Sequence, residues 1–295
     1  MLLATVTLWG LNFTVTKYVL SHGFQPIAYG CLRFGAAAAI LSSVAYTREH
    51  TLAMRRRDLI SLAGAALVGI FLNQLSFVYA VKLTTATTVA LLFGTLPVLA
   101  GLFAFVLGIE RLGRRFWLAG ALAAAGAALV AVGSSGAVST HVWGVVLALA
   151  ATATWAWYSV AASPLLQRYS PLRVSSLAFV IGSIPLFAVG SPQLASQDYG
   201  FGAGIWLLYV FAVLGPLVVA NLLWFGAISR VGPSRASVFA NLQPFIAAVF
   251  SLLILDESMT GLQVVGGLAI AGAIVLSRDR VAPARVRPVT QGAGK

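Results

Sequence analysis

Ten long apolar stretches constrain the fold of this chain more than any other feature of its sequence. A helix needs about 20 mostly apolar residues to cross the hydrocarbon core of a bilayer. The stretches also lack the strict alternation that the strands of a membrane barrel require. The sequence therefore predicts an all-α membrane protein with ten transmembrane helices. They are expected at residues 2–20, 26–46, 58–81, 84–107, 114–133, 142–163, 171–190, 202–228, 234–255 and 261–277.

Composition excludes the other classes of protein. Hydrophobic residues make up 60% of the chain and charged residues 9%, whereas soluble domains carry about 45–50% and about 25%. These values exclude a soluble globular domain and a disordered chain. The net charge of +12 is typical of arginine-rich cytoplasmic loops rather than of a nucleic-acid site. We therefore expect the partners to be the lipid bilayer and a small-molecule substrate, with no nucleic acid.

Loop charges predict the orientation. With the N-terminus in the cytoplasm, eleven basic residues fall in inward loops and five in the C-terminal tail, out of 19 in the chain. Such a bias specifies orientation well. We expect a multi-pass protein of a bacterial-type inner membrane with both termini cytoplasmic. No basic region precedes the first apolar stretch, which is therefore expected to remain as a helix rather than be cleaved.

An internal repeat appears when the sequence is shifted by 147 residues. Pro97 then meets Pro244, and Glu110 meets Glu257. Five helices per half is an odd number, so the second half starts on the opposite side of the membrane and the repeat is inverted. This predicts a first repeat at 1–137, a second at 138–280 and a basic, disordered tail at 281–295. Transporters commonly use this plan, with the substrate site near the midplane between the repeats.

Short motifs in each half are similar to those of a known family. The first half carries Trp9-Gly10-Leu11-Asn12-Phe13 followed by Lys17, then Leu32-Arg33-Phe34, Tyr79-Ala80-Val81-Lys82 and the stretch from Pro97 to Glu110. The second half carries Pro244, Asp256-Glu257 and Gly267. In order and spacing they resemble two EamA domains of the drug/metabolite transporter superfamily. The resemblance, which extends to about Ser277, implies a ten-helix transporter similar to aromatic amino-acid exporters. The second copy lacks counterparts of Lys17 and Arg33.

Polar and aromatic side chains within the spans are candidates for a solute pathway, because polar groups in a membrane cost free energy. Trp9 and Asn12 share one helical face, as do Trp155, Tyr158 and Ser159. The candidate substrate-binding residues are Trp9, Asn12, Asn73, Phe77, Tyr79, Phe93, Trp155, Tyr158, Ser159, Asn221, Trp224 and Asn241. Aromatic walls with amides and little net charge suit a neutral or zwitterionic solute that has an apolar side chain. The alternative role of these polar groups is to bridge helices.

Two prolines and three charged residues occupy notable helix positions. Pro97 and Pro244 each remove an intrahelical hydrogen bond and are candidate hinges, with a fixed kink as the alternative. Arg33 lies within a span, and its alternatives are snorkelling, a bond between helices, or a cavity where it meets a carboxylate. Glu110 and Glu257 are expected to be structural, because an acidic residue favours a helix N-terminus.

The remaining residues favour transport over catalysis. Every acidic residue and histidine falls at a span end or in a loop, so we expect no proton carrier in mid-membrane. Metal-site and phosphate-loop motifs are absent, and we expect neither a cofactor nor an enzyme. The sequence predicts a facilitated or weakly coupled transporter of small metabolites, above all aromatic or hydrophobic amino acids, that works by alternating access. The resemblance to the EamA family implies that it exports them.

The expected cavity lies between the helices at 2–20, 58–81, 84–107, 142–163, 202–228 and 234–255, with those at 114–133 and 261–277 peripheral. The alternatives are an exporter of drugs or other amphiphiles and, in another class, a non-transporting scaffold or lipid-handling protein. We expect a monomer or a homodimer.

Overall fold

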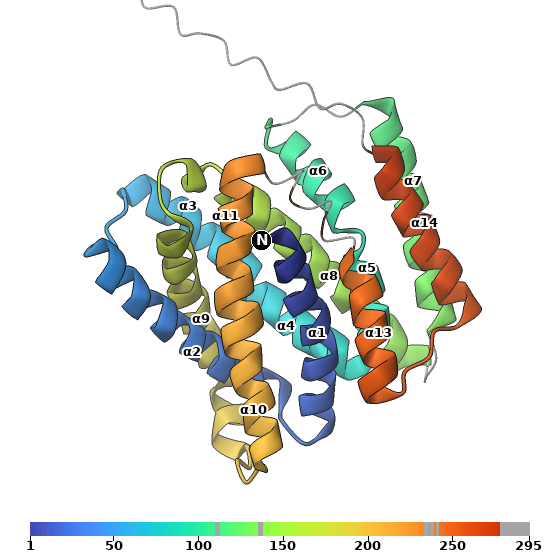
Figure 1. The fold of residues 1–295 in the computed structure, drawn as a ribbon, viewed down its shortest axis with the longest axis horizontal. Coiled ribbons are helices and arrows are strands. Elements are labelled where there is room, and N and C mark those ends of the chain that lie inside the picture. The colour runs from blue at the N-terminus through green and yellow to red at the C-terminus, as the bar shows by residue number, and fades with distance from the viewer. Residues whose placement is uncertain (110–112, 135–137, 233–235, 237–238, 240–241, 278–295) are drawn as a thin grey trace, which may run out of the picture.

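A computed structural model describes residues 1–109, 113–134, 138–232, 236, 239 and 242–277 (Figure 1). All regular structure in these residues is helical. The α-helices are α1 (Leu2–Ser21), α2 (Pro26–Glu49), α3 (Arg56–Ala66), α4 (Asn73–Leu83), α5 (Ala86–Phe93), α6 (Leu96–Val106), α7 (Arg114–Gly133), α8 (Val138–Ala162), α9 (Pro171–Ser196), α10 (Ala203–Ala212), α11 (Ala220–Val231), α13 (Gln243–Leu255) and α14 (Gly261–Ser277). Shorter elements are the π-helices η1 (Leu67–Leu72) and η3 (Val213–Val219) and the 3-10 helix η2 (Leu165–Gln167).

The length and composition of these helices identify a multi-pass membrane protein. Six helical segments of the described chain are long and apolar enough to cross a membrane, or seven if the bent pair α5 and α6 forms one span. Helix α13 and the part of α14 at Gly261–Ala273 are apolar but shorter. The all-helical class is confirmed, whereas the count of ten crossings stays a prediction.

Three of the predicted spans are interrupted within the described residues. Helices α5 and α6 meet at an angle of 41°, and the break falls on Gly94 and Thr95, just before Pro97. Because Pro97 lies in the first two positions of α6, its missing N–H costs no intrahelical bond. The other two interruptions are the π-helices, η1 between α3 and α4 and η3 between α10 and α11.

The two π-helices occupy corresponding positions in the two halves of the sequence. Shifting η1 by 147 residues places it at 214–219, within η3 at Val213–Val219. Pro216 lies inside η3, where it cannot donate a backbone hydrogen bond. Such π-segments are rare and often lie at functional sites. The repeat in the sequence is thus matched by a repeat in local backbone geometry.

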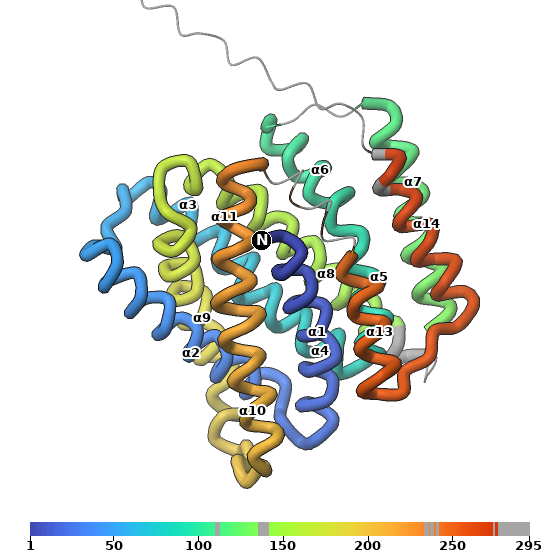
Figure 2. Tube along the Cα trace, viewed as in Figure 1, coloured from blue at the N-terminus to red at the C-terminus, as the bar shows by residue number. Residues whose placement is uncertain are grey.

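The helices divide into a central group and two edges (Figures 1 and 2). Helices α7 and α14 pair at one edge, while α2, α3 and α9 lie at the other. A Cβ atom on Gly126 of α7 would lie 2.7 Å from the carbonyl oxygen of Gly266 of α14. This close approach needs glycine on both helices. The pairing agrees with the prediction that these two segments are peripheral.

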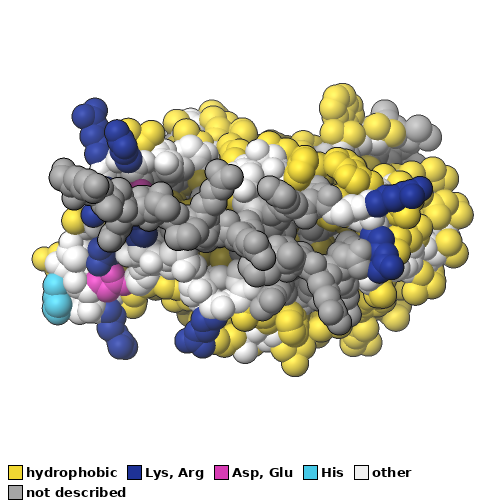
Figure 3. Space-filling view, turned by 90° about the horizontal axis from the view of Figure 1, so that it is seen from above, with side chains coloured by type: hydrophobic (Ala, Val, Ile, Leu, Met, Phe, Trp, Pro, Cys, Tyr) yellow, Lys and Arg dark blue, Asp and Glu magenta, His cyan; other side chains and the backbone are white. Residues whose placement is uncertain are grey.

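Charged side chains gather at the end of the bundle where α3 and α7 begin and α11 ends. Figure 3 shows Lys and Arg side chains around the rim of this end. Two ion pairs join α2 and α3 to the region of α9. Glu49 Oε2 lies 2.7 Å from Arg173 Nη2, and Asp58 Oδ1 lies 2.9 Å from Arg168 Nη1. These pairs use acidic residues far from the centre of the bundle.

Candidate functional site

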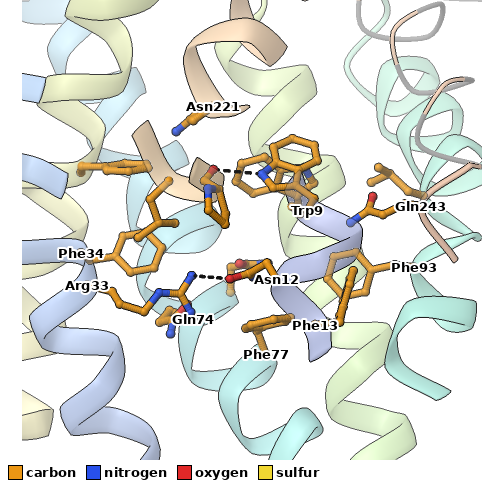
Figure 4. Close-up of a pocket in the computed structure, with 16 residues that line it drawn as sticks. Trp9, Asn12, Phe13, Arg33, Phe34, Gln74, Phe77, Phe93, Asn221 and Gln243 are labelled. Atoms are coloured by element: carbon orange, nitrogen blue, oxygen red, sulfur yellow. Dashed lines mark hydrogen bonds between the residues drawn. The ribbon is translucent and has the colours of Figure 1, made fainter. Parts of the chain in front are cut away.

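A cavity of about 80 Å³ lies at the centre of the bundle (Figure 4). A buried water needs roughly 10–15 Å³ of such space, so the cavity is large enough for several waters. Its wall comes from both halves of the chain. The lining residues are Trp9, Asn12, Phe13, Arg33, Phe34, Asn73, Gln74, Phe77, Phe93, Leu96, Trp155, Phe179, Pro216, Leu217, Asn221 and Gln243.

Three tryptophans form one side of this site. The ring of Trp9 lies 5.3 Å from that of Trp155, edge to face, and 5.1 Å from that of Trp224. Trp9 Nε1 also donates a hydrogen bond of 3.1 Å to the carbonyl oxygen of Pro216 in η3. Aromatic pairs in such arrangements stabilise one another beyond the burial of their area. Trp9 therefore joins α1 to α8, α11 and the π-helix η3.

Three phenylalanines form a second aromatic group. Phe13 of α1 lies 5.6 Å from Phe77 of α4 and 5.2 Å from Phe93 of α5, measured between ring centroids. Both contacts are edge to face. All three rings are largely buried and line the cavity. Together with the tryptophans they give the cavity the apolar walls typical of small-molecule sites.

Arg33 carries a buried positive charge at the cavity. Its side chain is 1% exposed, and it donates from Nη2 to Asn12 Oδ1 (3.2 Å) and from Nη1 to Thr16 Oγ1 (3.3 Å). The guanidinium carbon also lies 4.8 Å from the ring centroid of Tyr29. Snorkelling is therefore wrong for Arg33: the neighbouring hydroxyl, amide and ring hold the guanidinium inside the bundle, where it bridges α2 to α1.

Several buried polar atoms at the same cavity have no hydrogen-bond partner in the described part of the chain. They are Arg33 Nε, Gln74 Nε2, and both Asn221 Oδ1 and Nδ2. Gln74 and Asn221 are only 2% and 1% exposed. Burial of an unpaired polar group costs free energy, and native proteins leave few of them. Water or a solute in the cavity would supply the partners that these groups lack among the described residues.

The twelve predicted site residues have four different outcomes. Those that line the cavity are Trp9, Asn12, Asn73, Phe77, Phe93, Trp155 and Asn221. Trp224, Tyr158 and Ser159 lie in a layer behind them, where Trp224 Nε1 donates to Ser159 Oγ at 3.3 Å and the rings of Tyr158 and Trp155 are 5.5 Å apart. Tyr79 is outside the lining and accepts a hydrogen bond from Gln193. Asn241 falls outside the described residues.

Asn73 shows that lining a cavity and bridging helices are compatible. Its Nδ2 donates to the carbonyl oxygen of Ala151 at 2.6 Å and to Thr154 Oγ1 at 3.1 Å, both on α8. The amide nitrogen is therefore already engaged between α4 and α8. The bridging alternative is realised for this residue.

Sequence reasoning missed part of the wall. Phe34 comes from α2 and Phe179 from α9, two segments that were not expected at the cavity. Arg33, also on α2, lines the cavity, which was one of the alternatives for this residue. Gln74 was also missed, although it lies 147 residues before Asn221 and the repeat itself pairs them. The other missed residues are Phe13, Leu96, Pro216, Leu217 and Gln243.

Glu257 has a structural role at the opposite end of the bundle from the charged rim. Its carboxylate accepts hydrogen bonds from the backbone N–H of Ala86 (3.1 Å) and of Thr87 (3.0 Å) at the start of α5. Nearby, Lys17 Nζ donates to the carbonyl oxygens of Val81 (3.0 Å) and Thr84 (2.7 Å) near the end of α4. A negative charge at a helix N-terminus is stabilising. Glu257 thus stabilises the N-terminus of α5, although the helix that follows it in the sequence is α14. Glu110 lies outside the described residues.

Glu257→Gln is expected to lower the free energy of unfolding by about 1–2 kcal/mol, because an amide has one acceptor oxygen and no charge for the α5 N-terminus. Thermal unfolding of the purified protein in detergent measures the change. Asp256→Asn is the matched control, since Asp256 is exposed and asparagine accepts its left-handed backbone (φ 53°). Equal stability of the two variants would contradict the capping role.

Comparisons with known proteins agree with this architecture. The model of the EamA-like transporter family matches residues 1–132 and 142–278. The chain belongs to the EamA-like transporter family. An uncharacterized transporter of Archaeoglobus fulgidus is 28% identical over 94% of this chain and 97% of its own length. The uncharacterized inner membrane transporter YedA of Escherichia coli K12 is 26% identical over 99% and 95%.

One relative carries a substrate in its name. It is the probable terminal-alkyne amino-acid exporter of Streptantibioticus cattleyicolor, which is 30% identical over 92% of this chain and 93% of its own length. A solved crystal structure with a TM-score of 0.67 covers 94% of this chain and 95% of its own at 19% identity, and it shares the fold. The general function of this EamA protein is therefore membrane transport.

Proposed function

We propose that this EamA protein exports small metabolites, above all aromatic or hydrophobic amino acids, through the central cavity. The observation that carries the proposal is the combination of aromatic walls with unpartnered polar atoms of Arg33, Gln74 and Asn221 around one cavity. A zwitterion with an apolar side chain matches both kinds of surface. The name of the Streptantibioticus relative supports the same substrate class.

The proposed mechanism is alternating access between two inverted five-helix repeats around the cavity. In it all ten apolar stretches cross a bacterial-type inner membrane and both termini are cytoplasmic. The repeat is supported by the corresponding positions of the two π-helices and by Gln74 and Asn221, two amides that lie 147 residues apart. The basic rim in Figure 3 supports the orientation. Pro97 and Pro244 are the proposed hinges, because each lies in the first two positions of its helix.

We further propose that transport is facilitated or weakly coupled to ions. None of the described residues that line the cavity is acidic or a histidine, and proton-driven transporters commonly place such residues within the membrane. The described acidic residues that form ion pairs or caps do so away from the cavity, as Glu49, Asp58 and Glu257 show.

Purified protein in liposomes tests the proposed function. We expect saturable flux of labelled phenylalanine, tryptophan or leucine, with the same rate in the presence and absence of a pH gradient. Protein-free liposomes are the control for leakage. Absence of amino-acid flux from well-folded protein, with flux of amphiphilic drugs instead, would replace the substrate class. Absence of both would contradict transport and favour a scaffold or lipid-handling role.

A further inference from the structure

We propose that Arg33 binds the carboxylate of the transported solute and that the cavity selects monocarboxylates. The inference deepens the proposed transport function and rests on it for the identity of the cavity as the solute site. Arginine stays ionised in proteins. A buried charge is unfavourable unless an opposite charge and hydrogen bonds compensate it. Arg33 is buried in a predicted span, so its positive charge needs a counter-charge or hydrogen bonds to stabilise it.

The present partners of Arg33 are all uncharged. They are the hydroxyl of Thr16, the amide oxygen of Asn12 and the ring of Tyr29. Arg33 Nε has no hydrogen-bond partner among the described residues. Both hydrogen bonds run from the Nη atoms toward α1, so the Nε edge of the guanidinium remains unused. A carboxylate that accepts from this edge would form the charge-assisted type of bond that arginine makes best.

No described acidic residue supplies the missing negative charge. Glu49 pairs with Arg173 and Asp58 with Arg168, while Glu257 accepts from the start of α5. Asp198 and Asp256 are exposed. Within the described part of the chain, Arg33 therefore has no ion pair. A solute that carries a carboxylate would supply a counter-ion that can enter and leave the cavity.

The amide of Gln74 extends the site beside Arg33. A Cβ on Gly30, one helical turn before Arg33, would lie 2.9 Å from Gln74 Nε2, so this unpartnered donor packs on α2 beside the arginine. Figure 4 shows Gln74 next to the guanidinium and Asn221 across the cavity. Gln74 Nε2 is placed to donate to the same carboxylate. The aromatic rings then face the solute side chain.

The anion site is single, which sets the substrate class. The repeat-related position of Arg33 is Val180, a side chain 39% exposed on α9. The second half thus provides no counterpart to the arginine. One cation among the described lining residues compensates one carboxylate, so we expect recognition of monocarboxylic amino acids and rejection of glutamate and aspartate.

Competition among phenylalanine analogues tests the inference. The readout is displacement of tritiated phenylalanine from purified full-length protein in detergent, followed by inhibition of its flux in liposomes. We expect 3-phenylpropanoate, which keeps the carboxylate and lacks the amine, to compete. Phenylalaninamide and phenethylamine, which lack the carboxylate, are expected to compete at least about tenfold more weakly, as for loss of a hydrogen bond to a charged group. Glutamate is expected not to compete.

Variants separate binding from structural support. In Arg33→Gln we expect the preference for phenylalanine over phenylalaninamide to fall to near one, while Arg33→Lys retains part of it. A purely structural arginine would lower the affinity for all analogues and leave this ratio unchanged. Arg230→Gln is the matched control, because Arg230 is an exposed cation at the end of α11. If Arg33→Gln does not fold, Gln74→Leu supplies the second variant, and we expect it to weaken phenylalanine more than phenylalaninamide.

The outcomes distinguish this inference from the proposed function. Phenylalanine flux with equal competition by phenylalaninamide would overturn the role of Arg33 and leave amino-acid export standing. Binding that requires the carboxylate without any flux would support the role of Arg33 and contradict export. Neither binding nor flux of any carboxylate analogue would overturn both.

Discussion

Trp9→Ala is expected to reduce amino-acid flux by more than about tenfold, the largest loss that we expect from a single residue of the cavity wall. The indole of Trp9 contacts both Trp155 and Trp224, at 5.3 and 5.1 Å, and donates to the carbonyl oxygen of Pro216. Alanine would remove both ring contacts and leave that carbonyl group without its donor. The cavity wall would thereby lose the side chain that joins α1 of the first half to α8, η3 and α11 of the second half.

Matched variants separate the wall from the fold. Trp9→Phe keeps an aromatic ring and loses the N–H, so it is expected to retain more flux than alanine. Trp143→Ala is the control, because this tryptophan is 65% exposed and is expected to leave flux unchanged. The measurement is the initial rate in liposomes per amount of protein that elutes as a single species from size-exclusion chromatography. Equal flux for Trp9→Ala and Trp143→Ala would contradict passage through this cavity.

The helical class follows from the sequence because apolar length alone decides it. A polar backbone in lipid must satisfy its own hydrogen bonds, and helices of about 20 residues do so within one segment. The stretch at 26–46 accordingly appears as α2 at Pro26–Glu49, and that at 114–133 as α7 at Arg114–Gly133. The interruptions were not predictable in the same way. In η1 no proline or polar run interrupts the sequence Leu67–Leu72, so nothing in its hydropathy marks a π-helix.

The candidate site was predictable where a residue is unusual for a membrane and not where it is ordinary. Asn12 and Asn221 are amides in apolar runs, and both line the cavity. Phe34 and Phe179 look like any other apolar residue of a span, so only the packing of α2 and α9 reveals them. The sequence could not decide whether the guanidinium of Arg33 extends to the membrane surface or stays inside the bundle. That depends on the tertiary structure.

Gly69→Ala is expected to destabilise the protein by about 3 kcal/mol or more and to abolish flux, an overpacking effect at the upper end of the usual range. Gly69 lies within η1, where its backbone packs directly on the side chain of Tyr158 of α8. An added Cβ atom would overlap Cβ and Cγ of Tyr158, and Cβ cannot rotate away because it is fixed to the backbone. Helix α8 would have to move, together with Trp155 in the cavity wall.

Gly64→Ala provides the control for this prediction on the same predicted span. A Cβ atom on Gly64 would meet nothing within 4 Å, and alanine favours a helix more than glycine does. We therefore expect Gly64→Ala to unfold at the same temperature as the parent protein or slightly above it. Thermal unfolding in detergent and flux in liposomes measure the two effects.

If Gly69→Ala were as stable and as active as Gly64→Ala, the close packing of η1 on α8 would not be a feature of the working protein. The contact between η1 and α8 would then not be needed for alternating access. If the two variants differ as expected, this contact is part of what holds the cavity wall together.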